Sequence, residues 1–335
     1  MTWRRLALNG LYLLVALLVL GAGITAFMAN RQASAAEAEF PPIGAFVEVD
    51  GRQVHYIQQG SGPHVILLHG AGGNLREWTI GMMDRLAQDY TVTAFDRPGL
   101  GYTDRTPQVP TGAFATEGDS PVYQALMLRA AAEQLGITDP IVVGHSFGGI
   151  VAMAWATVGL ESPSPVNASA VVSFAGVLMP WPGDLGSYYT VLGSPLGGAV
   201  LIPLAAAWAS DERITGGIPD IFAPNPLPDA YIPTIGAPLT VRVENFRANV
   251  RQVNTLRPHV VEMLKRYPDL TLPIEIIHGT ADDTVPIHVH PQELIKVVDT
   301  ANLTPLPGVG HMPHHADPDA AVAAINRAAA RAGLR

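Results

Sequence analysis

Apolar runs alternate with helical segments along most of the chain after residue 45. Continuous apolar runs of about four to eight residues are typical of strands that are covered on both faces. We expect such strands at 64–68, 90–95, 140–143, 170–174, 274–277 and 302–306. Helices are expected at 76–88, 119–135, 149–156, 292–298 and from 317 onward. This alternation predicts an α/β fold with a mainly parallel sheet flanked by helices.

Two departures from the alternation define the predicted domains. At the start, 46–49 and 53–57 flank Asp50-Gly51, a strong signal for a β-hairpin. After Trp181 the chain becomes rich in Gly and Pro, and the alternation returns only after residue 268. We therefore expect a core formed by 45–180 and 269–335, interrupted by an insertion at 181–268. This insertion is expected to cap the carboxyl ends of the strands.

The amino terminus carries a long apolar segment. After Arg4 and Arg5, the stretch Leu6–Ala29 is almost uninterrupted, and a transmembrane helix needs about 20 such residues. We expect a membrane anchor or signal segment at 1–29 and a linker at 30–44. The paired arginines place the amino terminus in the cytoplasm and the body outside it. A small-residue triplet at 33–35 leaves signal cleavage and secretion as the alternative.

Composition excludes several functions. The chain has 335 residues and a net charge of −9, and it lacks a basic run beyond its first residues. Because phosphate binding needs clustered Lys and Arg, we expect no nucleic-acid partner. There is no cysteine, which excludes disulfides, thiolate metal sites and cysteine nucleophiles. Nothing in the sequence specifies the oligomeric state, the natural substrate or a partner protein.

A candidate nucleophile, Ser146, follows the apolar run at 140–143. It lies in Gly144-His145-Ser146-Phe147-Gly148, which leads into a predicted helix. Small residues on both sides of a serine allow the sharp strand–turn–helix bend that exposes its hydroxyl. An aspartate here would indicate attack by a carboxylate, whereas a serine indicates acyl transfer. Such a serine needs a base, an orienting acid and an oxyanion site.

Further motifs follow predicted strands in a recognisable order. They are His69-Gly70-Ala71-Gly72-Gly73, the run Asp96–Gly101, the segment His278–Asp282 and the run Gly308–Pro313. Together with the turn at Ser146, they resemble the α/β-hydrolases of the serine-nucleophile, esterase- and lipase-like type. The resemblance runs from about Phe46 to the carboxyl terminus, apart from most of the insertion. It implies an α/β-hydrolase sheet with an inserted cap.

The resemblance also implies a catalytic triad. Ser146 is the nucleophile, His311 the general base and Asp282 the acid that orients it, in the family's chain order. Asp283, the neighbour of Asp282, and Asp184 remain alternative acids. The backbone N–H groups of Ala71 and Phe147 are the expected oxyanion hole.

Other residues are expected to support this site. The loops around the nucleophile and the oxyanion hole are formed by His69, Gly70, Gly72, Gly73, Gly144 and Gly148. Asp96 is expected to be structural and to brace the turn that follows it.

Four more histidines, at 288, 290, 314 and 315, suggest a metal site by their number. Without a thiolate, and with the nearby carboxylates assigned to other motifs, we interpret them as surface or loop histidines. We expect no metal ion and no cofactor.

The resulting hypothesis is a serine hydrolase that cleaves a small or lipid-like apolar ester through an acyl-enzyme on Ser146. The membrane is a partner through the amino-terminal helix. The insertion contains aromatic residues, most of which we expect in a small core of its own: Trp181, Tyr188, Tyr189, Trp208, Phe222, Tyr231 and Phe246. A carbon–carbon bond hydrolase with the same triad, or a membrane-tethered binding protein that lacks turnover, remains open.

Overall fold

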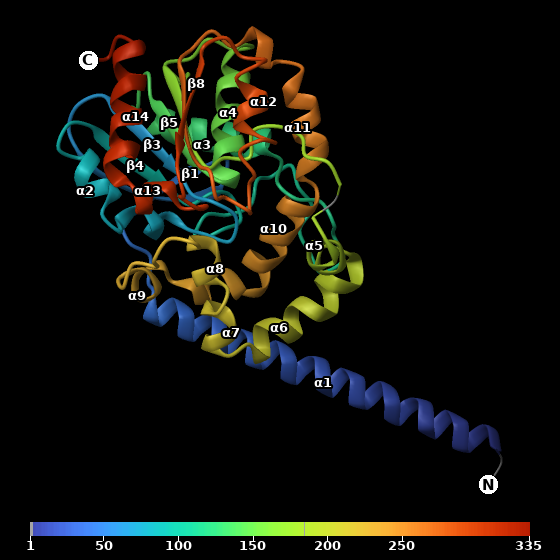
Figure 1. Ribbon diagram of the computed structural model, residues 1–335. Coiled ribbons are helices and arrows are strands. Elements are labelled where there is room, and N and C mark those ends of the chain that lie inside the picture. Colours follow the sequence, from blue (N-terminus) through green and yellow to red (C-terminus); the bar gives the residue numbers. More distant parts are fainter. Residues whose placement is uncertain (1–2, 184) are drawn as a thin grey trace.

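An eight-stranded sheet forms the centre of the computed structural model, which describes residues 3–183 and 185–335 (Figure 1). The strands are β1 (Ala45–Val49), β2 (Arg52–Gly60), β3 (His64–Leu68), β4 (Thr91–Phe95), β5 (Ile141–His145), β6 (Ala170–Phe174), β7 (Ile274–Gly279) and β8 (Ala301–Leu306). Their order is β1-β2-β4-β3-β5-β6-β7-β8. Strands β3 to β8 are parallel, and β2 pairs antiparallel with both β1 and β4. The predicted fold class is confirmed.

The first two strands form the predicted hairpin. Asp50 and Gly51 connect them with φ angles of 49° and 73°. Positive φ at both central residues gives the turn a twist that matches its strands. The pairing of Val49 with Arg52 follows directly from this two-residue loop.

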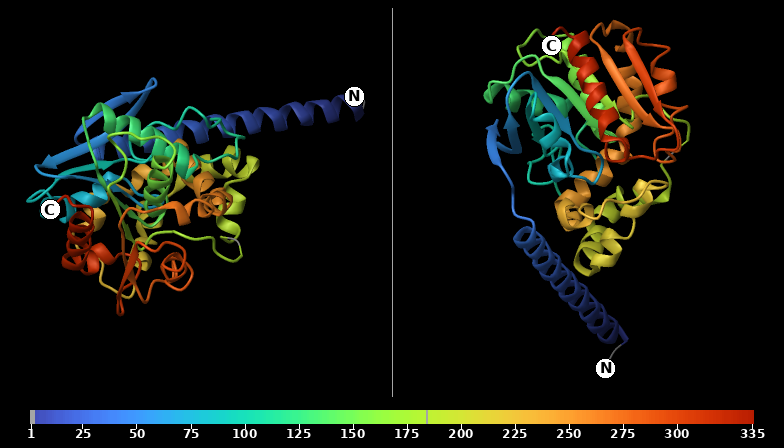
Figure 2. Two further views of the ribbon diagram at one scale, coloured as in Figure 1. Left: turned by 90° about the horizontal axis from the view of Figure 1, so that it is seen from above. Right: turned by 60° about the vertical axis from the view of Figure 1, so that its left-hand side comes forward.

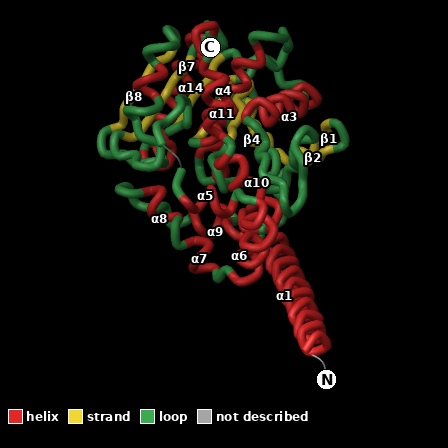
Figure 3. Tube along the Cα trace, turned by 90° about the vertical axis from the view of Figure 1, so that its right-hand side faces the viewer, coloured by secondary structure: helices red, strands yellow, loops and turns green. Residues whose placement is uncertain are grey.

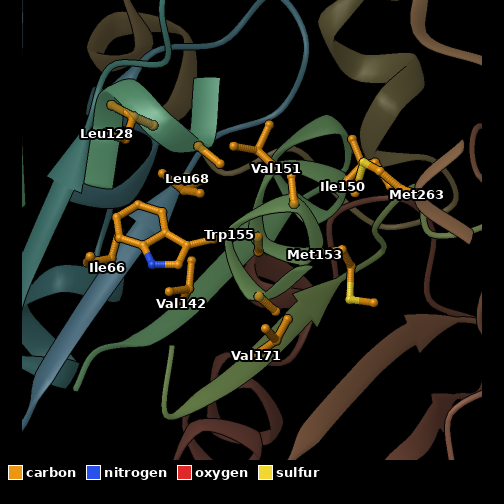
Figure 4. Close-up of a cluster of buried hydrophobic side chains, with 14 of the residues drawn as sticks. Ile66, Leu68, Leu128, Val142, Ile150, Val151, Met153, Trp155, Val171 and Met263 are labelled. Carbon is orange, nitrogen blue, oxygen red and sulfur yellow. The ribbon is translucent and has the colours of Figure 1, made fainter. Parts of the chain in front are cut away.

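Helices cover both faces of the sheet and bury its strands. Val142 faces a core that contains α3 (Pro121–Gln134) and α4 (Phe147–Gly159), whereas its neighbours Ile141 and Val143 face the opposite core. That second core is closed by α2 (Met82–Leu86) and α14 (Pro318–Arg331). Figure 4 shows Trp155 of α4 against the sheet side chains of the first core. Burial on both faces is why these strands read as unbroken apolar runs.

Two predicted helices are shorter in the structure. The segment 76–88 contains η1 (Leu75–Thr79) and α2, which are separated at Gly81 with a φ of 90°. The segment 292–298 contains only α12 (Pro291–Leu294) as regular helix. A left-handed residue cannot continue a right-handed helix, and this explains the first break. The short α13 (Pro313–Ala316) precedes α14, which Asp317 caps by accepting a hydrogen bond from Ala320 N.

All the regular structure between β6 and β7 is helical in the described residues. It consists of α5 (Ser187–Leu192), η2 (Gly197–Leu201), α6 (Ile202–Trp208), α7 (Asp211–Thr215), α8 (Ile218–Phe222), α9 (Tyr231–Ile235), η3 (Ala237–Val241), α10 (Val243–Asn254), α11 (Leu256–Leu264) and η4 (Tyr267–Asp269). Figure 3 shows these helices from α5 to α9 gathered at one end of the molecule, beside α1. The last part of the segment differs, because Leu256, Val260 and Met263 of α11 pack in the core around α4. We refer to 185–254 as the cap.

Helix α1 (Trp3–Glu39) extends further than the sequence predicts. The expected linker at 30–44 is wrong for residues 30–39, which continue the helix. Ala, Glu, Gln and Arg dominate this stretch, and all are strong helix formers. The apolar part of α1 is long enough to cross a membrane by length and composition, and none of its most apolar window is buried in the protein.

The carboxyl-terminal part of α1 packs on the cap. Ala29 is buried against Ala206 and Ala207 of α6, and Ala36 is buried with Phe40 and Leu239. Small side chains on both helices allow the two backbones to approach closely. Figures 1 and 2 show α1 running along the cap and then projecting away from the protein towards its amino terminus.

Candidate active site

The turn between β5 and α4 holds Ser146 in a strained conformation. Its φ and ψ angles are 51° and −118°, a region that residues other than glycine rarely adopt. The glycines on either side permit this turn. A Cβ added to Gly144 would lie 2.1 Å from the Gly148 carbonyl oxygen, and one added to Gly148 would lie 2.1 Å from the Leu68 carbonyl oxygen. The bend therefore requires glycine at both positions and directs the hydroxyl away from the sheet.

Ser146, His311 and Asp282 form a hydrogen-bonded chain. The Ser146 Oγ lies 2.9 Å from Nε2 of His311, and the opposite ring nitrogen, Nδ1, lies 2.8 Å from Oδ2 of Asp282. Three loops deliver the three residues, after β5, β7 and β8, at the same edge of the sheet. Since parallel strands end at a common edge, residues that are far apart in sequence meet there. The structure thus brings together all three residues that the sequence proposed as a triad.

The Asp282 carboxylate is fixed by its own loop. Oδ1 accepts hydrogen bonds from the backbone N–H groups of Thr284 and Val285, at 2.9 and 2.8 Å. Burial raises the pKa of this carboxyl, but hydrogen bonds from His278 and His311 outweigh burial and hold the pKa well below its ordinary value. Asp282 is therefore ionised at neutral pH.

The sequence also offers Asp283 and Asp184 as candidate acids. Asp283 is exposed and is not among the partners of His311. Asp184 lies outside the described residues.

His145 supports the loop that carries His311. Its Nε2 donates a hydrogen bond of 3.0 Å to the His311 carbonyl oxygen, and the two rings lie 5.0 Å apart between centroids. Burial, and the nearby His314 after it, lower the pKa of His145 well below its usual range. The ring is therefore neutral. With its proton on Nε2, the His145 ring links the turn that carries Ser146 to the loop that carries His311.

His69 shapes the loop after β3. It accepts a hydrogen bond from Arg97 N at Nε2 and donates one from Nδ1 to the Gly70 carbonyl oxygen, both at 2.9 Å. Burial, and then the charge of Arg97, lower the pKa of His69 to about 4, so the ring is neutral and can accept at Nε2. The Arg97 guanidinium lies over the Phe147 ring at 4.4 Å and also binds the carbonyl oxygens of His69 and Gly70. This network holds the loop against the nucleophile turn.

The amides of Ala71 and Phe147, which the sequence proposes as oxyanion donors, follow β3 and β5 at the same edge of the sheet. Phe147 N begins helix α4 directly after Ser146, at the positive end of the helix dipole. Neither amide donates a hydrogen bond to another protein group in the part of the chain that the structure describes. The next amide, Gly72 N, is already bound to Oδ1 of Asn249 at 2.7 Å. Ala71 is thus left to face the pocket.

The cap holds this loop from its other side. Thr240 donates a hydrogen bond of 2.5 Å to the Gly72 carbonyl oxygen, while Asn249 accepts from Gly72 N. Asn74, at the end of the loop, donates to the Ile235 carbonyl oxygen at 2.7 Å. Sequence analysis missed these contacts. No local pattern marks them, because they join positions more than 150 residues apart.

A pocket of about 870 Å³ lies between the sheet edge and the cap. Ser146 and His311 open into it together with Ala71 and Gly72. The cap side is mainly apolar and contains Tyr188, Tyr189, Leu192, Leu204, Trp208, Ile214, Ile218, Ile221 and Phe246. A large apolar cavity with a few convergent polar groups is typical of a small-molecule site.

The aromatic residues of the insertion serve two roles, lining the pocket and packing in the cap core. Tyr188, Tyr189, Trp208 and Phe246 line the pocket, whereas Phe222 packs in a small cap core with Tyr231, Ile235 and Met312. Tyr231 belongs to both. Phe246 also lies in a second small core, against which Tyr189 packs. The expectation of core packing therefore holds for most of these residues, and the pocket lining is an additional role for several of them.

Comparison with known proteins agrees with this architecture. Residues 65–325 match the alpha/beta hydrolase family. The chain belongs to the alpha/beta hydrolase family. An uncharacterized protein of Mycobacterium tuberculosis is 28% identical over 285 residues, which cover 83% of this chain and 78% of that protein.

Two solved structures share the fold at low identity. An esterase from Rhodococcus sp. ECU1013 superposes with a TM-score of 0.64 and 22% identity, covering 85% of this chain and 98% of that one. A bacterial membrane phospholipase A has a TM-score of 0.59 and 20% identity, covering 96% of this chain and 98% of that one. At these identities the likeness shows the fold alone.

A second group of buried polar side chains lies beside Ser146 and His311 in this alpha/beta hydrolase. Glu77 accepts hydrogen bonds from His314 at 3.0 Å, from Tyr231 at 3.3 Å and from His315 at 3.4 Å. Burial raises the pKa of Glu77, but hydrogen bonds from His314 and His315 hold it well below its ordinary range. Glu77 is thus an ionised carboxylate inside the protein, and sequence analysis did not identify it.

Metal binding was not expected at these histidines. Glu77, His145 and His314 each place one possible ligand atom within 4.8 Å of the others. The hydrogen bonds from two histidines and a tyrosine already satisfy the Glu77 carboxylate. They account for its burial without an ion.

The expectation of surface or loop histidines is wrong for His314, which is buried in α13, whereas His290 does lie in a loop although it is buried. His314 and His290 are buried, and His290 accepts backbone hydrogen bonds at Nδ1 from Leu178 and Met179. Burial lowers the pKa of each ring to about 4. His288 is exposed. His290 is buried because its loop returns under the start of the cap, where its ring lies against that of Trp181.

Proposed function

We propose that this protein is a serine hydrolase that cleaves ester bonds of apolar substrates. The observation that carries the proposal is the chain of two hydrogen bonds from Ser146 through His311 to the ionised Asp282. Membership of the alpha/beta hydrolase family and the fold shared with an esterase support hydrolase activity.

The reaction begins with attack of Ser146 Oγ on the ester carbonyl carbon. His311 Nε2 takes the hydroxyl proton, and Asp282 stabilises the imidazolium that forms. The amides of Ala71 and Phe147 donate to the oxyanion of the tetrahedral intermediate. When the C–O bond breaks, His311 returns its proton to the leaving alcohol, and the acyl group remains on Ser146.

Hydrolysis of the acyl-enzyme by water completes the cycle. His311 takes a proton from a water molecule that attacks the acyl carbonyl carbon. Collapse of the second tetrahedral intermediate releases the carboxylic acid, and His311 returns the proton to Ser146. The apolar side chains of the cap favour an apolar acyl or aryl group in the pocket.

We further propose that α1 remains attached as a membrane anchor with the catalytic body outside the cytoplasm. Its apolar stretch exceeds the roughly 20 residues that span a bilayer. Arg4 and Arg5 precede it, which favours a cytoplasmic amino terminus. The packing of Ala29 and Ala36 on the cap supports a helix that is part of the folded protein.

The test is hydrolysis of a chain-length series of p-nitrophenyl esters by the full chain in detergent. Ser146→Ala is expected to lower kcat by at least about 10⁴-fold, since the nucleophile is lost. Ser162→Ala, at an exposed serine, is the matched control and should retain full activity. A fluorophosphonate should label the parent chain at Ser146 and leave Ser146→Ala unlabelled.

Two outcomes would contradict the proposal. A folded protein that neither turns over nor labels would be a binding protein. A protein that labels at Ser146 but cleaves no ester would be a hydrolase of another bond, and vinylogous diketones would then test for carbon–carbon cleavage.

A further inference from the structure

One surface of the cap is apolar and exposed. The segment 185–210 contains no Asp, Glu, Lys, Arg or His, although charged residues usually make up about a quarter or more of a soluble surface. It includes α5, η2 and α6. Its large exposed apolar side chains are Leu185, Tyr188, Val191, Leu196, Val200, Leu201, Leu204 and Trp208. We call these eight residues the apolar face.

The apolar face lies next to the apolar part of α1. Pro203 shares a small crevice with Ala26 and Ala29. Further along, Ala206 and Ala209 share another crevice with Ala33 and Ala36. Helices α6 and α1 therefore run in the same general direction where they pack, and Figure 1 shows α6 diverging from α1 towards its amino-terminal end.

Because of this shared direction, residues that precede Pro203 in the chain lie towards the amino-terminal side of α1. Leu196 precedes Pro203 by seven residues in the chain, which corresponds to roughly 10 Å along a helix. It thus extends beyond Ala26 towards the exposed apolar stretch that contains Ile24 and Leu20. The exposed side chains of η2 consequently extend in the direction of the exposed part of α1.

Both α1 and the segment 185–213 become charged towards their carboxyl-terminal ends. On the cap, charged residues resume at Asp211, Glu212 and Arg213. On α1 they resume at Arg31 and continue with Glu37 and Glu39. Asp211, Glu39 and Arg242 border the same crevice as Ala36. The segment 185–213 and α1 thus change from apolar to charged in the same direction, as they would at the surface of a bilayer. Arg242, Glu244 and Arg247, later in the cap, border the crevice that contains Ala26.

The pocket opens on the apolar face. Tyr188, Leu204 and Trp208 line the pocket and are also exposed on this surface. Tyr and Trp are the residues that membrane proteins place at the boundary between lipid and water. An acyl chain in the bilayer could therefore reach the pocket along apolar side chains, without crossing water.

We propose that the apolar face inserts into the leaflet next to α1, and that the pocket takes its substrate, an acyl ester of a bilayer lipid, directly from the membrane. This inference rests on the proposed ester hydrolysis and on a retained anchor. A second copy of the chain would also cover an apolar surface. The proximity to α1 favours lipid, because α6 packs on α1 and the apolar face projects towards the part of α1 that a membrane would contain.

The absence of cysteine in the parent chain allows a direct test. Leu196→Cys carries the only thiol and is labelled with an environment-sensitive fluorophore after reconstitution of the full chain into phosphatidylglycerol vesicles. Leu160→Cys, at the far end of α4, is the matched control, since Leu160 is also an exposed leucine. We expect the label at 196 to shift to the blue and to be quenched by lipids with spin-labelled acyl chains, and the label at 160 to do neither.

Two results would overturn the proposal. One is a label at 196 that stays accessible to an aqueous quencher. The other is a label that is protected from water, escapes the lipid quencher and depends on the protein density in the vesicle, which would assign the face to a second copy.

Activity provides the second measurement. Leu196→Asp combined with Val200→Asp places two charges on the apolar face, away from the pocket lining. We expect hydrolysis of phosphatidylglycerol in the vesicle to fall about tenfold or more, because charges oppose insertion. Hydrolysis of soluble p-nitrophenyl butyrate should stay within about twofold of the parent, and Leu160→Asp should change neither.

Equal loss of both activities would refute lateral access, as would retention of lipid hydrolysis. Absence of activity on every ester by the parent chain would refute the proposed function alone, because the labels at 196 and 160 report insertion independently of turnover.

Discussion

The edge of the sheet that carries Ser146 and the cap that covers it contribute to the pocket in different ways. At the edge, backbone fits backbone: a Cβ at Gly144 or Gly148 would overlap another main chain at 2.1 Å. In the cap, an added Cβ would meet no heavy atom within 4 Å at Gly186 and Gly217, but it would lie 1.9 Å from the Val191 carbonyl oxygen at Gly197. Tight main-chain contacts thus occur in both regions. Those at the sheet edge fix the turn of Ser146, whereas those at Gly197 lie outside the pocket lining, which cap side chains form.

The sheet edge and the cap also differ in the number of ionisable groups that they bury. The sheet edge buries Asp282, Glu77 and five neutral or hydrogen-bonded histidines in a small volume: His69, His145, His278, His311 and His314. The opposite side of the pocket is mostly hydrocarbon and tyrosine. Substitutions at the edge should therefore change rates by orders of magnitude, and substitutions in the cap should change them by small factors.

The largest contrast is expected at two adjacent carboxylates. Asp282→Asn should lower kcat by about 10⁴-fold, because the amide cannot hold the same His311 tautomer or stabilise the imidazolium. Asp283→Asn is the matched control and should stay within about twofold, since that side chain is exposed. Steady-state kinetics on p-nitrophenyl butyrate measure both. Equal losses in the two variants would refute the assignment of the acid.

The stability of the core should depend on pH through buried histidines. Burial lowers the pKa of His290 to about 4 in the folded chain, against about 6.5 when unfolded. Because the folded state binds fewer protons between these values, its stability is complete above pH 6.5 and falls as the pH drops towards 4. At pH 5 this single group should cost about 2 kcal/mol of unfolding free energy.

Chemical denaturation at pH 7 and pH 5 measures this effect. His290→Gln removes the titrating ring while keeping an acceptor for Leu178 N and Met179 N, so the difference between the two pH values should shrink. The control is His288→Gln, at an exposed position nearby, and it should keep the full difference. A parent-like difference in His290→Gln would show that this ring does not carry the effect.

The contact between cap and oxyanion loop should have an intermediate effect. Asn249→Ala leaves Gly72 N without its partner and allows the loop that carries Ala71 to shift. We expect kcat to fall about tenfold with little change in KM, because donors of an oxyanion hole act in the transition state. Asn245→Ala, on the same helix but bonded to Gly99 and Gly101, should leave kcat within about twofold. A change in KM alone would assign Asn249 to substrate binding.

The smallest effect is expected in the pocket lining. Leu192→Trp narrows the pocket from the cap side and should lower kcat/KM for the longest p-nitrophenyl ester about fivefold, while short esters are unaffected. Thr190→Trp adds the same side chain to α5 at an exposed position outside the lining and should leave the chain-length profile unchanged. A uniform loss over all chain lengths would contradict an acyl site at Leu192.

Prediction from sequence succeeded where the local pattern reports burial. Strands such as β5 and β6 are covered on both faces, so an apolar run is sufficient to locate them. The turn at Ser146 is equally local, since Gly144 and Gly148 are its immediate neighbours. The resemblance to α/β-hydrolases then ordered Asp282 and His311, and the structure brings them to Ser146.

Prediction failed where long-range packing determines the environment. Glu77 and His314 are separated by 237 positions, and the hydrogen bond between them compensates for the burial of both. The extension of α1 over residues 30–39 is favoured by contacts of Ala36 with the cap that no sequence window contains. The apolar face was also missed, because each of its short runs resembles an ordinary buried helix until the fold shows it unpartnered.

Gly72 is bound on both sides of its peptide by residues of the cap, through Thr240 and Asn249. A cap exchanged with that of another hydrolase as a module would therefore remove two supports of the active site along with the pocket wall. Grafts that join the chains before Ala237 would retain Thr240, Asn249 and the geometry of the loop. Grafts that join after Asn254 would replace Thr240 and Asn249 as well, and would therefore change substrate preference and turnover rate together. Specificity can thus be changed independently of rate only by replacing cap residues that precede Ala237.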